Sequence, residues 1–174
     1  MIYLALLFTA DRLTKSYADL AFTSGATEVV IPRIIGFSYT VNSGAAWGIL
    51  SDKTWLLSVF TWVVIFVCLY CLLLKPLYSP WMHTALILII AGGLGNLYDR
   101  IVQGGVTDFL MFLFMRFPIF NFADCCISTG AAIAMVNMLT SAEKEPLFLD
   151  GTVDKSEVSS RKTEDTGSRD ETEQ

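Results

Sequence analysis

Histidine and formal charge are scarce over most of this chain, and several familiar catalytic patterns are missing. The 174 residues include one histidine, His83, and four cysteines, whose spacing does not match a zinc site. The sequence contains no Gly-rich phosphate-binding loop and no Gly-x-Ser-x-Gly nucleophile motif. These absences argue against a zinc enzyme, a P-loop nucleotide-binding protein and a hydrolase of the α/β type.

The cysteines offer little chemistry of their own. Cys68 and Cys71 form a C-x-x-C pair, but this pair lies within an apolar run with no second pair nearby, which argues against a metal or redox role. Cys125 and Cys126 can be read as nucleophiles. A Cys–His pair is disfavoured, because His83 lies near the start of the predicted helix Trp81 to Tyr98. It is about 22 Å along the helix axis from Tyr98 at the other end.

The charged residues divide the chain into two unequal parts. The first 140 residues hold seven acidic and seven basic side chains, whereas residues 141–174 hold ten acidic and five basic ones, which accounts for the net charge of -5. After Leu149 the chain is rich in Ser, Thr, Asp and Glu and has few apolar residues, so we expect a disordered acidic tail. Its acidity argues against nucleic acid and anionic lipid as partners of the tail.

Long apolar runs fill the first part of the chain, in which hydrophobic residues are frequent. Three of these runs are long enough to cross a bilayer as helices: Thr54 to Leu74, Trp81 to Tyr98 and Phe122 to Thr140. The first of them carries no formal charge and would be about 31 Å long as a helix, close to the roughly 30 Å of a hydrocarbon core.

A fourth span, from Met1 to about Leu20, requires an explanation for its charges. It can cross the membrane only if Asp11, Arg12 and Lys15 face protein or reach the interface. A cleaved signal peptide is the alternative, but paired charges stand where a small-residue cleavage pattern would be expected. We therefore predict a membrane α-helical domain over residues 1–140, with four transmembrane helices.

Between the first two spans the pattern changes to that of extended structure. Within Glu28 to Trp47, apolar side chains alternate with polar ones from Phe37 to Asn42, which is the period of a half-buried strand. We expect residues 21–53 to form a small β-rich lobe that rests on the membrane surface.

Two carboxylates carry the most informative chemistry. Asp108 follows Gly104 and Gly105 and precedes the aromatic stretch Phe109 to Phe120, which has the composition of an interfacial segment; Asp124 opens the last apolar run. The intervening residues are enough for the chain to fold back, and two carboxyl groups a few Å apart would share one proton near neutral pH. The ionised one can then activate water while the neutral one polarises a carbonyl oxygen. The alternative is a helix N-cap at Asp124 and an exposed loop carboxylate at Asp108.

Other polar residues in the spans have two readings. Asn96 and Asp99 share a helix face with Gly92. Both can either form hydrogen bonds between helices or belong to a functional site. Arg100 is either an interfacial anchor or a ligand for a phosphate or a carboxylate. Asp11 and Lys15 are spaced to pair on one helix face, and a structural pair is the favoured reading.

Five short motifs occur in a fixed order along the chain. They are Asp11-Arg12-Leu13-Thr14-Lys15, Asn42-Ser43-Gly44-Ala45-Ala46-Trp47, Gly92-Gly93-Leu94-Gly95-Asn96-Leu97-Tyr98-Asp99-Arg100, Gly105-Val106-Thr107-Asp108-Phe109 and Phe117-Pro118-Ile119-Phe120-Asn121-Phe122-Ala123-Asp124. Together with four spans, this set resembles the bacterial lipoprotein signal peptidases, or signal peptidase II, an aspartic membrane peptidase family. The resemblance covers roughly Ala10 to Gly130.

The resemblance implies residue roles and an activity. It implies that Asp108 and Asp124 are the catalytic aspartates, and that a further set supports the site or binds substrate: Asp11, Lys15, Asn42, Gly44, Asn96, Asp99, Arg100, Asn121 and Ala123. The implied enzyme is an endopeptidase that removes signal peptides from prolipoproteins before a Cys carrying a diacylglyceryl group, with no metal and no other cofactor. Its implied partners are prolipoproteins and membrane lipids, and not nucleic acid.

The resemblance also implies a location and an orientation. It places a multi-pass protein in the bacterial cytoplasmic membrane, with both termini and the acidic tail in the cytoplasm and with the β-rich lobe and active site at the extracytoplasmic face. The basic residues near the spans favour the opposite orientation, with Lys75 and Lys144 on the side of the termini and a larger set on the other side. We follow the resemblance, because Arg100 belongs to one of its motifs.

Two other functions fit parts of the pattern. Intramembrane Asp, Asn and Arg side chains also occur in small proton- or ion-coupled carriers, although four spans without an inverted repeat disfavour that reading. A scaffold whose polar residues only join helices would tolerate Asp108→Asn.

Overall fold

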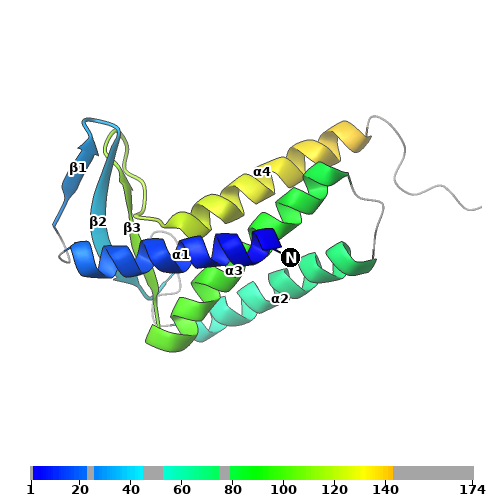
Figure 1. The fold of residues 1–174 in the computed structure, drawn as a ribbon, viewed down its shortest axis with the longest axis horizontal. Coiled ribbons are helices and arrows are strands. Elements are labelled where there is room, and N and C mark those ends of the chain that lie inside the picture. The colour runs from blue at the N-terminus through cyan, green and yellow to red at the C-terminus, as the bar shows by residue number, and fades with distance from the viewer. Residues whose placement is uncertain (1, 23–25, 45–52, 75–78, 143–174) are drawn as a thin grey trace, which may run out of the picture. The chain divides into compact units, whose positions relative to one another are not determined.

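Four helices and a small sheet make up the part of the chain that the structure describes. The structure, a computed structural model, describes residues 2–22, 26–44, 53–74 and 79–142 (Figure 1). The helices are α1 (Ile2–Ala21), α2 (Thr54–Leu74), α3 (Pro80–Gln103) and α4 (Phe122–Ala142). The strands are β1 (Glu28–Ile31), β2 (Ile35–Asn42) and β3 (Val106–Phe112).

The third helix is the centre of the helical part. α1 and α2 both pack against α3, and glycines on α3 allow close approach by its neighbours. A Cβ at Gly92 would collide with the backbone oxygen of Ala123 on α4, and one at Gly95 would collide with the carboxylate of Asp11 on α1. The small residues of the third motif therefore bring α1, α3 and α4 together.

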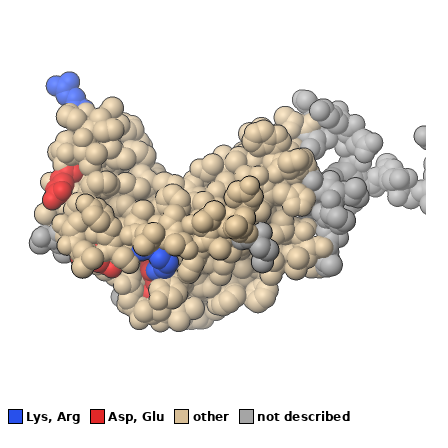
Figure 2. All heavy atoms as spheres, in the orientation of Figure 1, with Lys and Arg blue, Asp and Glu red and all other residues tan. Residues whose placement is uncertain are grey.

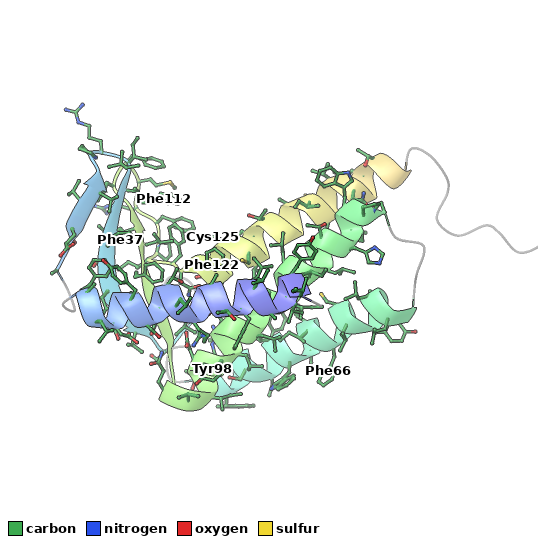
Figure 3. The ribbon with its side chains drawn as sticks, in the orientation of Figure 1. Phe37, Phe66, Tyr98, Phe112, Phe122 and Cys125 are labelled. Atoms are coloured by element: carbon green, nitrogen blue, oxygen red, sulfur yellow. The ribbon has the colours of Figure 1, made fainter. Side chains whose placement is uncertain are left out.

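The apolar core lies mainly between α2 and α3. Its buried members are Ile65, Cys68, Met82, Leu86, Ile90 and Leu97. All four cysteines are free thiols, and Cys68 packs in this core, as its position within an apolar run indicates. On the outer side of α2, side chains such as Phe66 point away from the bundle and are exposed (Figure 3). An apolar outer face of this kind is what a lipid environment requires.

Three of the helices are long and apolar enough to cross a membrane. They are α2 over Thr54–Leu73, α3 over Pro80–Gln103 and α4 over Phe122–Thr140. The prediction of four spans is therefore confirmed in part: α1 forms a helix at the expected place, but it falls outside this set. The physical reason is the presence of four charged side chains within its twenty residues.

The antiparallel sheet has the order β1-β2-β3. The predicted lobe supplies β1 and β2, whereas β3 comes from residues that follow α3. The sequence reading of Phe109 to Phe120 as an interfacial segment did not predict a strand, whereas its first residues belong to β3 and Phe112 pairs with Ile35. The first four residues of β3 are all buried, so the strand lacks the alternation of polar and apolar residues that identifies a strand with one exposed face.

The sheet stands across one end of the helices. Its strands run crosswise to α1 in Figure 1, and β3 contacts both α1 and α3. A series of aromatic contacts joins the end of α1 to the sheet, from Phe22 to Phe37 and on to Phe109. This arrangement places the middle of β3 beside the polar end of α3 and the first turn of α4.

Candidate active site

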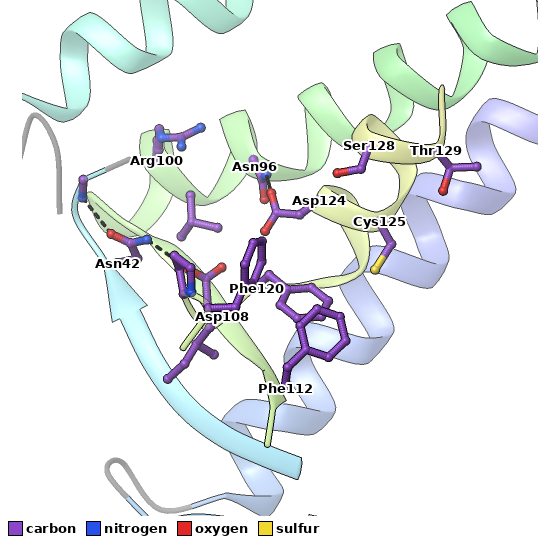
Figure 4. Close-up of a pocket in the computed structure, with 15 residues that line it drawn as sticks. Asn42, Asn96, Arg100, Asp108, Phe112, Phe120, Asp124, Cys125, Ser128 and Thr129 are labelled. Carbon is purple, nitrogen blue, oxygen red and sulfur yellow. Dashed lines mark hydrogen bonds between the residues drawn. The ribbon is translucent and has the colours of Figure 1, made fainter. Parts of the chain in front are cut away.

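Asp108 and Asp124 line the same cavity. Asp108 lies in the middle of β3 and is 3% exposed, while Asp124 lies in the first turn of α4. The cavity has a volume of about 480 Å³ and opens between the sheet and α4 (Figure 4). Its other lining residues are polar side chains and a group of aromatic and small ones: Asn42, Gly44, Asn96, Arg100, Val106, Phe112, Phe117, Pro118, Ile119, Phe120, Cys125, Ser128 and Thr129.

Asn121 connects the two carboxylates. Its backbone N–H donates to Oδ2 of Asp124 at 3.1 Å, and the backbone N–H of Asp124 donates to Oδ1 of Asn121 at 3.0 Å. This reciprocal pair caps the N-terminus of α4. The side-chain Nδ2 of the fully buried Asn121 donates to Oδ1 of Asp108 at 2.6 Å. One amide therefore fixes the start of α4 and also holds the carboxylate on β3.

Asp108 is held on both of its oxygens. Nδ2 of Asn42, at the end of β2, donates to the second oxygen of Asp108 at 3.1 Å, and the Oδ1 of Asn42 accepts from the backbone N–H of Gly44 at 2.9 Å. The reading of Asp108 as an exposed loop residue is therefore wrong. Burial and the nearby charge of Asp124 raise the pKa of Asp108 to about 7, against the opposing effect of the two amide donors.

Asn96 orients the other carboxylate. Its Nδ2 donates to Oδ1 of Asp124 at 2.8 Å, while its Oδ1 accepts from Nζ of Lys15 at 2.9 Å and from Nδ2 of Asn121 at 3.1 Å. Because two donors point at Oδ1, the amide nitrogen of Asn96 must point toward Asp124. A lysine on α1 thus helps to set the geometry of a carboxylate on α4.

Behind Asn96 lies a largely buried cluster of two acidic and two basic side chains. Nζ of Lys15 is 2.8 Å from Asp99 and 3.2 Å from Asp11, which confirms the spacing-based prediction of an Asp11–Lys15 pair. Arg12 pairs with both Asp11 and Asp99, and its guanidinium lies 4.7 Å from the ring centroid of Tyr98. Asp99 also accepts from the backbone N–H of residue 107, which ties β3 to this cluster. Its charges cancel.

The sequence reasoning did not place Arg12 among the site residues. Arg12 stands next to Asp11 in the first motif, yet it completes the cluster from α1. Cys125, Ser128 and Thr129 of the cavity wall were also absent from the expected set. A helical-face argument could have found one of them, because Ser128 is four residues after Asp124 and lies on the same side of α4.

The remaining expected residues have distinct positions. Arg100 lines the cavity, and its buried Nε has no hydrogen-bond partner among the described residues. Ala123 is fully buried where α4 meets α3. Gly44 lines the cavity, whereas Ala45, Ala46 and Trp47 of its motif lie outside the described residues. Within residues 2–22, 26–44, 53–74 and 79–142, no three His, Cys, Asp or Glu side chains are grouped as a metal site would require.

Comparison with known proteins adds an independent line of information. Residues 3–140 match the family model described as Signal peptidase (SPase) II. A lipoprotein signal peptidase of Lactococcus lactis subsp. cremoris (strain SK11) is 38% identical over 134 residues, which cover 77% of this chain and 89% of that protein. The lipoprotein signal peptidase of Streptococcus pneumoniae (strain ATCC BAA-255 / R6) is 39% identical over 138 residues, which cover 79% of this chain and 90% of that protein.

Two solved structures have a similar fold. Both are described as bacterial membrane enzymes determined by the in meso method, one at 2.3 Å and one at 1.9 Å resolution. The first aligns with a TM-score of 0.77 and 28% identity over 88% of this chain and 93% of its own. The second aligns with a TM-score of 0.73 and 31% identity over 79% of this chain and 90% of its own.

The fold, the apolar helices and these similarities define a bacterial membrane protein of the peptidase class. The chain belongs to the signal peptidase II family. The family expected from the five motifs is thereby confirmed.

Proposed function

We propose that this protein is an aspartic endopeptidase that removes signal peptides from prolipoproteins. The activity follows from the family, whose members here are named lipoprotein signal peptidases. The observation that supports the aspartic mechanism is the presence of Asp108 and Asp124 on one cavity, joined through Asn121. No other pair of carboxylates among the described residues lines that cavity.

The two carboxylates have different surroundings, which assigns them different roles. The raised pKa of Asp108 means that it keeps a proton near neutral pH, and this proton can polarise the carbonyl oxygen of the scissile bond. Asp124 accepts hydrogen bonds from the amide of Asn96 and from the backbone of Asn121, and it lies in the first turn of α4, where the helix dipole favours a negative charge. Asp124 is then the base that takes a proton from the attacking water.

The reaction conserves atoms and protons with these two groups alone. Water forms a C–O bond to the carbonyl carbon as Asp124 takes its proton and Asp108 gives one to the carbonyl oxygen. In the second step, the C–N bond breaks, the leaving nitrogen takes the proton held on Asp124, and the new hydroxyl returns a proton to Asp108. The products are a carboxylic acid and an amine, and the pair regains its single proton.

The substrate detail is part of the same proposal. We infer that cleavage occurs before a Cys that carries a diacylglyceryl group. The cavity supports this because the apolar side chains of Phe112, Phe117 and Phe120 line it together with Asp108 and Asp124. A substrate anchored by lipid chains stays in the bilayer, so its scissile bond is held near the membrane surface.

We also propose that α1 is a fourth transmembrane helix. Its charged residues Asp11 and Lys15 are buried against α3 and are paired, which reduces the cost of placing them in a membrane. Most of its exposed side chains are apolar, such as Leu13 and Tyr17, each more than 60% exposed, and the exposed Asp19 lies in its last turn. Four spans place both termini on one side of the cytoplasmic membrane, and we assign that side to the cytoplasm and the cavity to the extracytoplasmic face. Residues 1–140 then belong to the peptidase domain, and a cytoplasmic tail follows α4; the expected disordered tail beyond Ala142 lies outside the described residues.

A cleavage assay with purified protein tests the proposal. The substrates are a diacylglyceryl-modified prolipoprotein and the same prolipoprotein without the lipid. We expect release of the signal peptide from the lipidated form alone. Cleavage of both forms at equal rates would refute the substrate assignment, and cleavage of neither would refute the activity.

A further inference from the structure

The β1–β2 turn and the loop after β3 meet at one end of the sheet. The backbone N–H of Leu113 donates to the carbonyl oxygen of Ile34 at 3.0 Å, and Phe112 pairs with Ile35. We call residues 29–34 and 113–118 together the sheet rim. In Figure 1 the rim is the end of the sheet farthest from the end of α3, and it projects sideways from the helices.

The sheet rim exposes large apolar side chains. They are Val29, Val30, Ile31, Ile34, Phe114, Met115 and Phe117, of which Phe114 is 63% and Val29 is 59% exposed. Two exposed arginines, Arg33 and Arg116, are the only charged residues of the rim. The closest acidic residue along the chain is Glu28, at the opposite end of β1. A basic side chain protrudes from this end of the sheet in Figure 2.

A second, shallow groove lies in the rim beside the candidate active site. Its volume is about 430 Å³, and its lining is apolar apart from Arg116: Met111, Phe112, Met115, Phe117 and Pro118 complete it. Phe112, Phe117 and Pro118 also line the cavity that holds the two aspartates. The groove and the cavity are therefore neighbours that share one wall.

Arg33 has a backbone conformation in the β1–β2 turn that is uncommon for a residue with a side chain. Ile34 N–H donates to the carbonyl oxygen of Ile31 at 3.0 Å, with Pro32 second in the turn and Arg33 third at a φ of 64°. This position of such a turn normally holds glycine, because a side chain is strained there. Such a backbone outlier motivates a hypothesis about the function of its side chain.

We propose that the sheet rim lies in the headgroup layer of the bilayer and binds an anionic phospholipid. The apolar side chains and the groove take the upper part of the acyl chains, and Arg33 and Arg116 bind the phosphate and the charged headgroup. Lipid is the occupant that fits, because the rim projects from the sheet at one end of helices that are apolar and exposed on their outer sides. Its two cations and lack of carboxylates complement an anionic surface.

Hydrogen–deuterium exchange of the full chain in nanodiscs tests this without any substrate. One set of discs contains phosphatidylcholine alone, and the other contains phosphatidylcholine with one third phosphatidylglycerol. We expect the amides of residues 29–35 and 111–117 to exchange more slowly in the anionic discs, by about fivefold for each arginine that binds lipid. This difference should shrink in 0.5 M salt, because salt screens exposed charges.

Matched variants separate lipid binding from folding. Arg33→Gly removes the charge and suits the turn, and combined with Arg116→Gln it should abolish the lipid-dependent difference while the helices stay protected. Arg116→Lys should retain most of the lipid-dependent difference in exchange, because it keeps the positive charge. Lys53→Gln, which removes an exposed cation outside the rim, should leave it unchanged.

Two results would overturn the proposal. One is equal exchange of the rim in the two kinds of disc, or the same lipid dependence in the double variant as in the unmodified protein. The other is protection that appears only on addition of prolipoprotein, which would assign the groove to the substrate. Neither result depends on whether the protein cleaves prolipoproteins, so failure here is distinct from failure of the proposed activity.

Discussion

Two groups of carboxylates lie next to each other at the polar end of α3. One group is paired with cations, and the other accepts hydrogen bonds from neutral donors. Asp11 and Asp99 form ion pairs with Arg12 and Lys15. Asp108 and Asp124, by contrast, are held by the amides of asparagines and by a backbone N–H, and no ion pair to either occurs among the described residues.

The difference separates a structural role from a chemical one. The carboxylates of Asp11 and Asp99 are paired with two cations, and these ion pairs join α1 to α3 inside the protein. Carboxylates held by neutral donors keep their mutual repulsion, so one of them retains a proton that a reaction can use. The same residue type therefore supports the fold in one place and carries the proposed chemistry in the other.

The largest expected effect is the loss of either cavity carboxylate. Asp108→Asn and Asp124→Asn should each reduce cleavage of a lipidated prolipoprotein by about 10³-fold, because the general acid or the base is missing. The thermal unfolding temperature in detergent should fall little or rise, since a buried repulsion is removed. Turnover within tenfold of the unmodified protein by either variant would remove the pair from the mechanism.

Loss of a carboxylate from the ion-paired cluster should lower the stability of the protein and leave its activity largely intact. Asp11→Asn leaves the buried Lys15 and the half-buried Arg12 with one acidic partner, and breaking a buried pair in this way costs about 3 kcal/mol of unfolding free energy. We expect a clear drop in unfolding temperature, while the protein that remains folded keeps most of its activity. An unchanged unfolding temperature together with lost activity would place Asp11 with the catalytic group instead.

Asn121 both caps α4 and holds the carboxylate of Asp108, and one substitution separates these two roles. Asn121→Ser keeps a good helix N-cap but removes the amide that reaches Asp108 and Asn96. We expect stability to change by only about 1 kcal/mol, while kcat falls by about 100-fold because the carboxylates lose their relative positions. If kcat is unchanged and stability falls instead, Asn121 acts only as a cap.

The last prediction concerns pH. The pKa of Asp108 is about 7 in the folded protein because of burial and the charge of Asp124, compared with about 3.9 in an unfolded chain. From about pH 4 to 7 the folded protein keeps a proton that the unfolded chain has lost, so the free energy of unfolding decreases as pH rises through this window. In a pH–rate profile, activity should fall about tenfold per pH unit above about pH 7. A flat profile up to pH 9 would contradict this assignment.

The helices could be predicted from the sequence largely because membrane spans follow from composition. α2 has the predicted bounds, and α4 begins at the predicted residue and continues slightly further. α3 runs to Gln103 instead of ending near Tyr98. The polar residues that made the apolar run appear to end are satisfied by α1 and β3, so they do not end the helix.

The third strand and part of the site could not be predicted in the same way. The first four residues of β3 are buried whichever face they point to, and the strand pairs with β2 across a long stretch of sequence, so no local period identifies it. The motifs pointed to Asn42, Asn96 and Asn121, and the structure brings all three to the aspartates. Nothing in the motifs indicated that Asn121 connects both carboxylates, because that link depends on how the chain folds back between β3 and α4.

The central claim is that one proton resides on the Asp108–Asp124 pair near neutral pH. Infrared spectroscopy of the purified protein measures it directly, through the C=O stretch of a protonated carboxylic acid. We expect one such band at pH 6 that disappears with a midpoint near pH 7, is lost in Asp108→Asn and persists in Asp11→Asn. Absence of the band at pH 6, or its persistence in Asp108→Asn, would contradict the claim.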